Sequence, residues 1–365
     1  MKKGFTVVYS ATLLLCSIAG MALAFYFGLQ ASVWQGVMAI VGVLLGSMLA
    51  PIAHELGHVF FAVKNGMKPV FLKCFCFCYQ RMDGRKRISL VSPFLPDETR
   101  ALPKFGGDMK KRAVWYTLGG LIFSGIFVAL IAIFATVWTA FLGDAYLLLG
   151  MLPYSAYLFL LNAVPLVYPS GKTDARVYLG LKKGYGEERV FLSAMEIQGK
   201  LAEGNSFSEI DERLYFDLPQ LPEDEPLFAV ICDLRYRFYL EKNELEKAAD
   251  CLNRWAGAEP YLSTYEQEKL LAELLYMHAL NGDFESAEAC GKGCKAFLKS
   301  SEVLAKRALA AYSLAFGELD AAEILVRQAY EALEKEEIEG VKKAERILIS
   351  RIEKGIKERE NGNKE

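Results

Sequence analysis

Long apolar stretches alternate with polar ones in the first half of this chain, and charges are frequent throughout the second half. The apolar stretches cover residues 5–29, 37–61, 113–141 and 145–168. Each is long enough to cross a bilayer about 30 Å thick as a helix. The pattern predicts a transmembrane helical domain over residues 1–184. Residues 5–29 also resemble a secretion signal, but their apolar core is longer than usual, so we expect an uncleaved helix.

Basic residues cluster between the second and third apolar stretches. Residues 64–112 contain twelve Lys or Arg, whereas the short connections around Gln30 and Asp144 contain none. Because cytoplasmic loops carry such an excess, the asymmetry places this loop and both termini in the cytoplasm. The expected location is a bacterial cell membrane, in which the chain is an integral, multi-pass protein.

The basic loop also shows the alternation of β-strands. Residues 69–79 and 86–94 predict two strands joined by a turn at residues 82–84, which together form a small hairpin at the membrane surface. Cysteines within the first strand fall at the strand period, on one face: Cys74, Cys76 and Cys78. They either pack as small apolar residues or bind a metal or a lipid.

The charged second half predicts soluble helices. Residues 185–225 contain two prolines in their last part and predict a connector, and residues 226–365 predict a cytoplasmic helical domain. Similar short stretches recur there, each with a turn and an apolar residue between two amphipathic helices. Their apolar residues are 39 and 35 residues apart: Leu245, Phe284 and Leu319. This resembles a tetratricopeptide-type array, whose concave face commonly binds peptides, with a plain helical bundle as the alternative.

Composition agrees with this division into a membrane part and a soluble part. Hydrophobic residues make up 53% of the chain, which is too many for an ordinary soluble protein. The net charge of -2 and the lack of a basic stripe argue against a nucleic-acid partner. The fold class is therefore predominantly α: a polytopic transmembrane helical core with a small β hairpin, followed by soluble helical repeats.

The candidate chemistry lies at the end of the second apolar stretch. His54, Glu55 and His58 form an H-E-x-x-H pattern and include two of the chain's three histidines. On a helix, positions four apart share a face, so both imidazoles can bind one zinc ion while the carboxylate faces the metal's open site. An ionisable cluster in a membrane segment would be costly without a function.

A catalytic zinc usually takes three protein ligands, and the pattern supplies two. The fourth apolar stretch ends in a segment with two prolines and a glycine, which predicts a broken helix end at the cytoplasmic side. Asp174 follows this segment. Its carboxylate is the candidate third ligand.

Together these residues resemble the site-2 protease family of intramembrane zinc metalloproteases. The family pairs an H-E-x-x-H with a later N-x-x-P…D-G segment, and here the later segment is similar to Asn162, Pro165 and Asp174, with alanine in place of the final glycine. Gly119-Gly120-Leu121 is similar to a glycine motif of the intervening helix, with Ser124 at the usual position of asparagine. The resemblance covers residues 37–181.

The resemblance implies hydrolysis of peptide bonds in transmembrane or membrane-associated substrates. Zinc, held by His54, His58 and Asp174, would activate water and polarise the scissile carbonyl. Glu55 would transfer the proton to the leaving amine, and Asn162 would hold the substrate backbone or the developing oxyanion. Two alternatives stay open: a non-proteolytic membrane scaffold that acts through its repeats, and an enzyme that matures peptide precursors.

Overall fold

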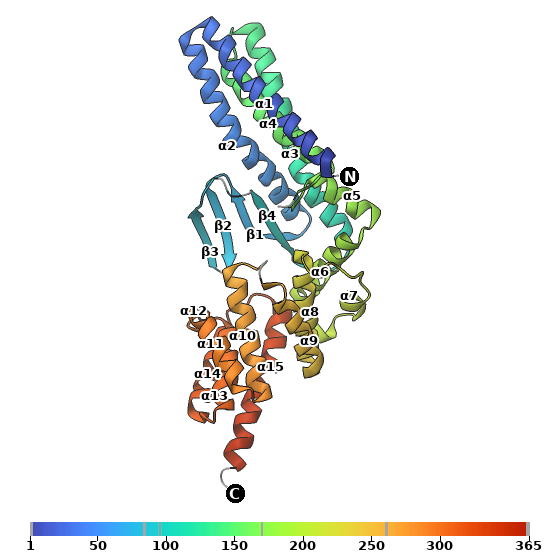
Figure 1. Ribbon diagram of the computed structural model, residues 1–365, viewed down its shortest axis with the longest axis vertical. Coiled ribbons are helices and arrows are strands. Elements are labelled where there is room, and N and C mark those ends of the chain that lie inside the picture. Colours follow the sequence, from blue (N-terminus) through green and yellow to red (C-terminus); the bar gives the residue numbers. More distant parts are fainter. Residues whose placement is uncertain are drawn as a thin grey trace. The chain divides into compact units, whose positions relative to one another are not determined.

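The computed structural model describes residues 3–82, 85–93, 95, 97–168, 171–259 and 262–362. The described chain is predominantly helical (Figure 1). It divides into two compact units, the first containing most residues up to Glu188 and the second those from Arg189 onward together with Pro103–Gly107.

The four long apolar helices of the first unit are those that the hydrophobic pattern predicts. They are α1 (Lys3–Ala31), α2 (Val33–Lys64), α3 (Met109–Phe141) and α4 (Tyr146–Ala163). Each is long and apolar enough to cross a membrane. Figure 1 shows the four helices side by side, with the sheet near the end of α2. The prediction of four apolar helices is therefore confirmed within the described residues.

Helix α2 contacts its neighbours backbone to backbone. A Cβ atom added at Gly42 would lie 2.0 Å from the carbonyl oxygen of Leu147 on α4, and one at Gly57 would lie 2.2 Å from that of Gly119 on α3. Only glycine allows approaches this close. These crossings fix α2, and hence the residues at its end, against both α3 and α4.

The sheet differs from the predicted hairpin. Its strands are β1 (Met67–Cys74), β2 (Phe77–Met82), β3 (Arg85–Leu90) and β4 (Glu98–Pro103), in the order β3-β2-β1-β4. Residues 69–79 are thus not one strand, because the chain reverses between Cys74 and Phe77, which face each other across β1 and β2. The predicted common face of Cys74, Cys76 and Cys78 is wrong for the same reason. Two residues of the other predicted turn, Asp83 and Gly84, lie outside the described residues.

The reversal was hidden because it uses none of the usual turn residues. Phe75 adopts a left-handed backbone with φ +51°, a conformation that favours glycine. Its backbone N–H donates a hydrogen bond of 2.8 Å to the carboxylate of Asp97, which comes from a distant part of the sequence. A tertiary contact therefore stabilises this turn.

Helix α4 ends at Ala163, before the predicted limit of residue 168, because Pro165 cannot continue the helical hydrogen bonding. A short hairpin of β5 (Val167–Tyr168) and β6 (Gly171–Lys172) follows and leads into α5 (Asp174–Lys183). The Thr173 hydroxyl accepts a hydrogen bond from the backbone N–H of Leu166 and donates one to the carbonyl oxygen of Val164. It thereby fixes the loop that delivers Asp174.

The second unit begins within the predicted connector. Helices α6 (Gly186–Ala202) and α7 (Arg213–Phe216) and the 3-10 turn η1 (Phe207–Glu209) occupy this stretch. Val190, Ile197 and Tyr215 are fully or nearly fully buried in the same core as the later helices. Most of residues 185–225 therefore belong to the second unit's folded core. The prolines that suggested a linker, Pro219 and Pro222, lie in one loop after α7.

Three helical hairpins follow: α8 (Pro226–Glu241) with α9 (Leu245–Ala256), α10 (Thr264–Asn281) with α11 (Phe284–Gly293), and α13 (Val303–Ala315) with α14 (Leu319–Leu333). The short α12 (Lys295–Leu298) and the long α15 (Glu339–Gly362) complete the unit. The similar stretches of the sequence are the turns of these hairpins. Each turn has one residue with positive φ at the same offset: Asn243, Gly282 and Gly317.

A buried ionic cluster joins three of these helices. The Arg307 side chain, 0% exposed, donates hydrogen bonds of 2.8 Å to Glu273 on α10 and to Glu345 on α15. Burial alone would raise the pKa of Glu273, but the Arg307 and Arg237 guanidinium groups hold it below its ordinary value. Glu273 and Arg307 are therefore an ion pair inside the core of the helical unit, whereas burial raises the pKa of Glu345.

Candidate metal centre

Helix α2 brings the two histidines of the H-E-x-x-H pattern together. His54 and His58 are each 7% exposed and lie one turn apart. Their Nε2 atoms are 3.3 Å apart. The sequence pattern therefore corresponds to a single buried site at the end of α2.

Asp174, the first residue of α5, lies far from the histidines in sequence but beside them in the structure. Its Oδ2 atom lies 3.3 Å from His54 Nε2 and 3.5 Å from His58 Nε2. The N-terminus of a helix favours a carboxylate, because the helix dipole and free N–H groups are positive there. These three residues, all candidate ligands in the sequence, form a group that could hold a metal ion.

The spacing of the three atoms fits zinc. For tetrahedral coordination with bonds of about 2.0–2.1 Å, neighbouring ligand atoms lie about 3.3–3.4 Å apart. The observed separations are 3.3, 3.3 and 3.5 Å. Asp174 Oδ2 is also buried and has no hydrogen-bond partner in the described part of the chain. A buried oxygen of this kind is accounted for by a bound cation.

Contacts on the far side of each imidazole set the tautomer that a metal needs. His58 Nδ1 lies 2.8 Å from the backbone carbonyl oxygen of Tyr116, which can only accept, so Nδ1 carries the proton and Nε2 presents its lone pair. His54 Nδ1 lies 2.9 Å from the Ser124 hydroxyl, which can accept in the same way. Such partners orient metal-binding histidines and increase their basicity.

Gly120 on α3 supplies the space for the site. A Cβ atom at this position would lie 2.4 Å from His58 Nε2 and 2.8 Å from His54 Nε2. Any other residue would press on the two nitrogens that could hold a metal ion. The glycine pair noted in the sequence is therefore a structural part of the site, with Gly119 against α2 and Gly120 against the histidines.

Glu55 is next to His54 in the sequence, but its hydrogen bond is to Thr99 and not to a candidate ligand. It is 5% exposed, and its Oε2 atom accepts a hydrogen bond of 2.6 Å from the Thr99 hydroxyl on β4. Its other oxygen has no hydrogen-bond partner in the described ranges. A carboxylate held at one oxygen and open at the other is suited to proton transfer.

Asn162 makes no hydrogen bond with the three candidate ligands in the described part of the chain, and its side chain is hydrogen-bonded to its own helix. Its side-chain amide donates a hydrogen bond of 3.2 Å to the carbonyl oxygen of Leu158, one turn earlier in α4. The role that the resemblance implies for Asn162 stays a prediction, and it requires the side chain to turn away from its own helix.

Sequence reasoning missed two site residues, Thr99 and Tyr116, and noted Ser124 and Gly120 only as part of a glycine-rich helix. Ser124 stands where the family that this chain resembles usually has asparagine, and this could have indicated that its side chain contacts the site. Thr99 gave no local signal, because its contact depends on where β4 lies against α2.

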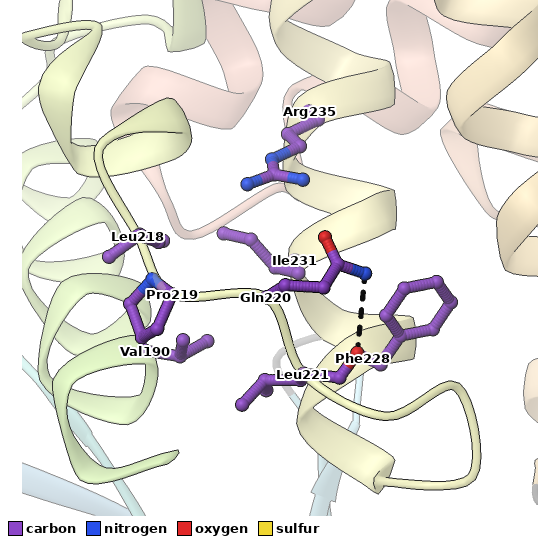
Figure 2. Close-up of a pocket in the computed structure, with 8 residues that line it drawn as sticks. All are labelled: Val190, Leu218, Pro219, Gln220, Leu221, Phe228, Ile231 and Arg235. Atoms are coloured by element: carbon purple, nitrogen blue, oxygen red, sulfur yellow. Dashed lines mark hydrogen bonds between the residues drawn. The ribbon is translucent and has the colours of Figure 1, made fainter. Parts of the chain in front are cut away.

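Comparison with profiles of known protein families, with curated proteins and with solved structures finds no match to this chain. The metal centre is therefore interpreted from its own geometry. A pocket in the second unit, lined mainly by apolar side chains with Arg235 at its edge, has room for about one water molecule (Figure 2). The Arg235 Nε atom donates to the backbone of Tyr215, so we assign this pocket no substrate.

Proposed function

We propose that this protein is an intramembrane zinc metalloendopeptidase of the site-2 protease type, which hydrolyses peptide bonds of membrane-embedded or membrane-associated substrates. The observation that carries the proposal is the convergence of His54, His58 and Asp174 at tetrahedral spacing, with Glu55 next to them. A structural zinc site would have four protein ligands, whereas three leave one position open for chemistry.

Each residue then has a defined task. Zinc, when bound, would supply Lewis-acid activation of water and of the scissile carbonyl. Glu55 takes the proton of the attacking water at its open oxygen and returns it to the leaving amine. His54 and His58 donate from Nδ1 to the Ser124 hydroxyl and the Tyr116 carbonyl, so their Nε2 atoms keep the lone pairs that would hold the metal.

A transmembrane substrate must unwind near the site, because the backbone of a helix is closed to attack by its own hydrogen bonds. Capture of the unwound segment by strand addition would use a free edge of the sheet. Strands β1 and β2 lie in the interior of the sheet, so the edges open to a substrate are β3 and β4.

The remaining assignments of the proposal follow from the sequence. The four apolar helices form a multi-pass core with both termini in the cytoplasm. The helical hairpins form a tetratricopeptide-like cytoplasmic domain that binds a substrate or a regulatory peptide. The shared turns support this likeness, because each places a fully buried alanine at the same offset: Ala248, Ala287 and Ala322.

The test compares cells that make the wild-type protein with cells that make Glu55→Gln at matched levels. This substitution keeps the size of the side chain and its contact with Thr99 but removes the base. We expect membrane and cytosolic peptides that appear only with the wild type and with the control Glu323→Gln, an exposed position on α14. Identical peptides in all three strains, together with purified protein that lacks zinc, would refute the proposal.

A further inference from the structure

The edge strand β4 contacts Glu55, the base of the proposed reaction. Thr99 is 8% exposed, and its hydroxyl donates to Glu55 Oε2 at 2.6 Å, across 44 positions of sequence. The carbonyl oxygen of Thr99 in turn accepts a hydrogen bond from the Tyr116 hydroxyl on α3. Thr99 therefore links β4 both to α2, which carries Glu55, and to α3, which carries Tyr116.

A second attachment lies two residues earlier. One carboxylate oxygen of Asp97 accepts from Lys73 Nζ at 2.7 Å and from the backbone N–H of Phe75 at 2.8 Å. The Lys73 side chain is 3% exposed and also donates to the carbonyl oxygen of Leu95. These contacts tie the start of β4 to the turn between β1 and β2.

That turn is strained. A bulky residue such as Phe75, with φ +51°, persists in a left-handed backbone only where its surroundings impose it, and Asp97 provides the hydrogen bond that does so. Strain of this kind is found where a structure must hold a precise position. Asp97, which holds this turn, stands two residues before Thr99, immediately before the first residue of the same strand.

We infer that Thr99 is a positioning residue for Glu55, and that Asp97 positions Thr99, so that the β1–β2 turn and β4 set the orientation of the base. This inference rests on the proposed function. The hydroxyl of Thr99 occupies one oxygen of Glu55 and directs the other toward the proton that it must accept. Thr99 itself touches no candidate metal ligand among the described contacts.

The test uses the full chain purified in detergent, with fluorescein-labelled β-casein as a generic unfolded substrate. Thr99→Val keeps the shape of the side chain and removes the hydroxyl, so we expect kcat to fall about 10- to 100-fold with KM changed less than about twofold. Thr99→Ser restores the hydroxyl and should recover kcat to within about threefold. Equal kcat values for the Val and Ser variants would overturn the inference.

Asp97→Asn provides a second arm, because the hydrogen bonds of Asp97 go to Lys73 and Phe75 and not to Glu55, on which Asp97 acts directly only through its charge. We expect a fall of kcat in the same direction as for Thr99→Val, and little further loss when the two changes are combined, since they act on one contact. Independent, additive losses would overturn the role of Asp97. Zinc content should equal that of the wild type in every variant.

A readout without catalysis separates this inference from the proposed function. In a double-mutant cycle of Thr99→Val and Glu55→Ala, we expect each change to lower the unfolding midpoint by about 2–4 °C, and the second to cost less once the first is present. Coupling without any cleavage by the wild type would refute the protease while keeping the contact. Midpoint shifts that simply add would refute the positioning of Glu55 by Thr99.

Discussion

Replacing Gly120 by alanine is the sharpest test of the metal centre. The added Cβ would lie 2.4 Å from His58 Nε2, about 1.0 Å inside the 3.4 Å at which ordinary contact begins. Zinc ligands tolerate deviations of only about 0.2 Å, so the ligand nitrogens must move too far to keep their geometry. Loss of an outer partner of a ligand typically costs 10- to 100-fold in metal affinity, and displacement of the ligand itself should cost at least about 100-fold.

The assay measures zinc per chain in purified protein and the zinc affinity by competition with a chelator of known affinity. The matched control is Gly125→Ala on the same helix, where the nearest atom, 3.2 Å away, belongs to the movable ring of Phe159. We expect the control to retain zinc and the Gly120→Ala protein to lose it, with both still helical by circular dichroism. Folded Gly120→Ala protein with wild-type zinc affinity would refute the interpretation of the site.

Three further predictions concern the surroundings of the site and the helical unit. Ser124→Ala removes the partner of His54 Nδ1 and should weaken zinc binding about 10- to 100-fold by the same chelator assay, and unchanged affinity would contradict the tautomer argument. Arg307→Ala removes the fully buried cation that Glu273 and Glu345 share and leaves them only the longer contacts of 3.5 and 3.9 Å with Arg237, so it should destabilise the helical unit by about 3–5 kcal/mol in urea unfolding, whereas replacing the whole cluster by apolar residues should cost less. Gly317→Ala, at φ +82°, should cost about 1 kcal/mol, while Asn243→Gly, at φ +63°, should be neutral or stabilising; the reverse order in thermal unfolding would contradict the shared turn geometry.

Local patterns in the sequence predict much of this structure. The four apolar helices follow from runs without charge, and the approach of His54 to His58 follows from the period of a helix. Asp174 is predictable because the broken end of α4 had to return the chain to the same side as the histidines. The three turns of the helical hairpins follow from a repeated pattern of turn residue, apolar residue and alanine.

The features that sequence reasoning missed depend on distant contacts. The turn at Phe75 contains no glycine, asparagine or proline, and its hydrogen bond comes from Asp97. The contact of Thr99 with Glu55 requires the order of the strands, which alternation alone does not give. Residues 185–225 looked like a linker because two prolines stand in one loop, although the helices before that loop bury Val190, Ile197 and Tyr215.

The position of Asp174 has a consequence for biogenesis. The two histidines emerge from the ribosome early, but the carboxylate that completes the set is 116 residues further on and reaches them only after the loop fixed by Thr173 has formed. A nascent chain with only its first helices inserted would therefore hold an incomplete and inactive site. Under the proposed function, an enzyme able to cut membrane proteins stays harmless to its own translocation machinery until its membrane domain is assembled.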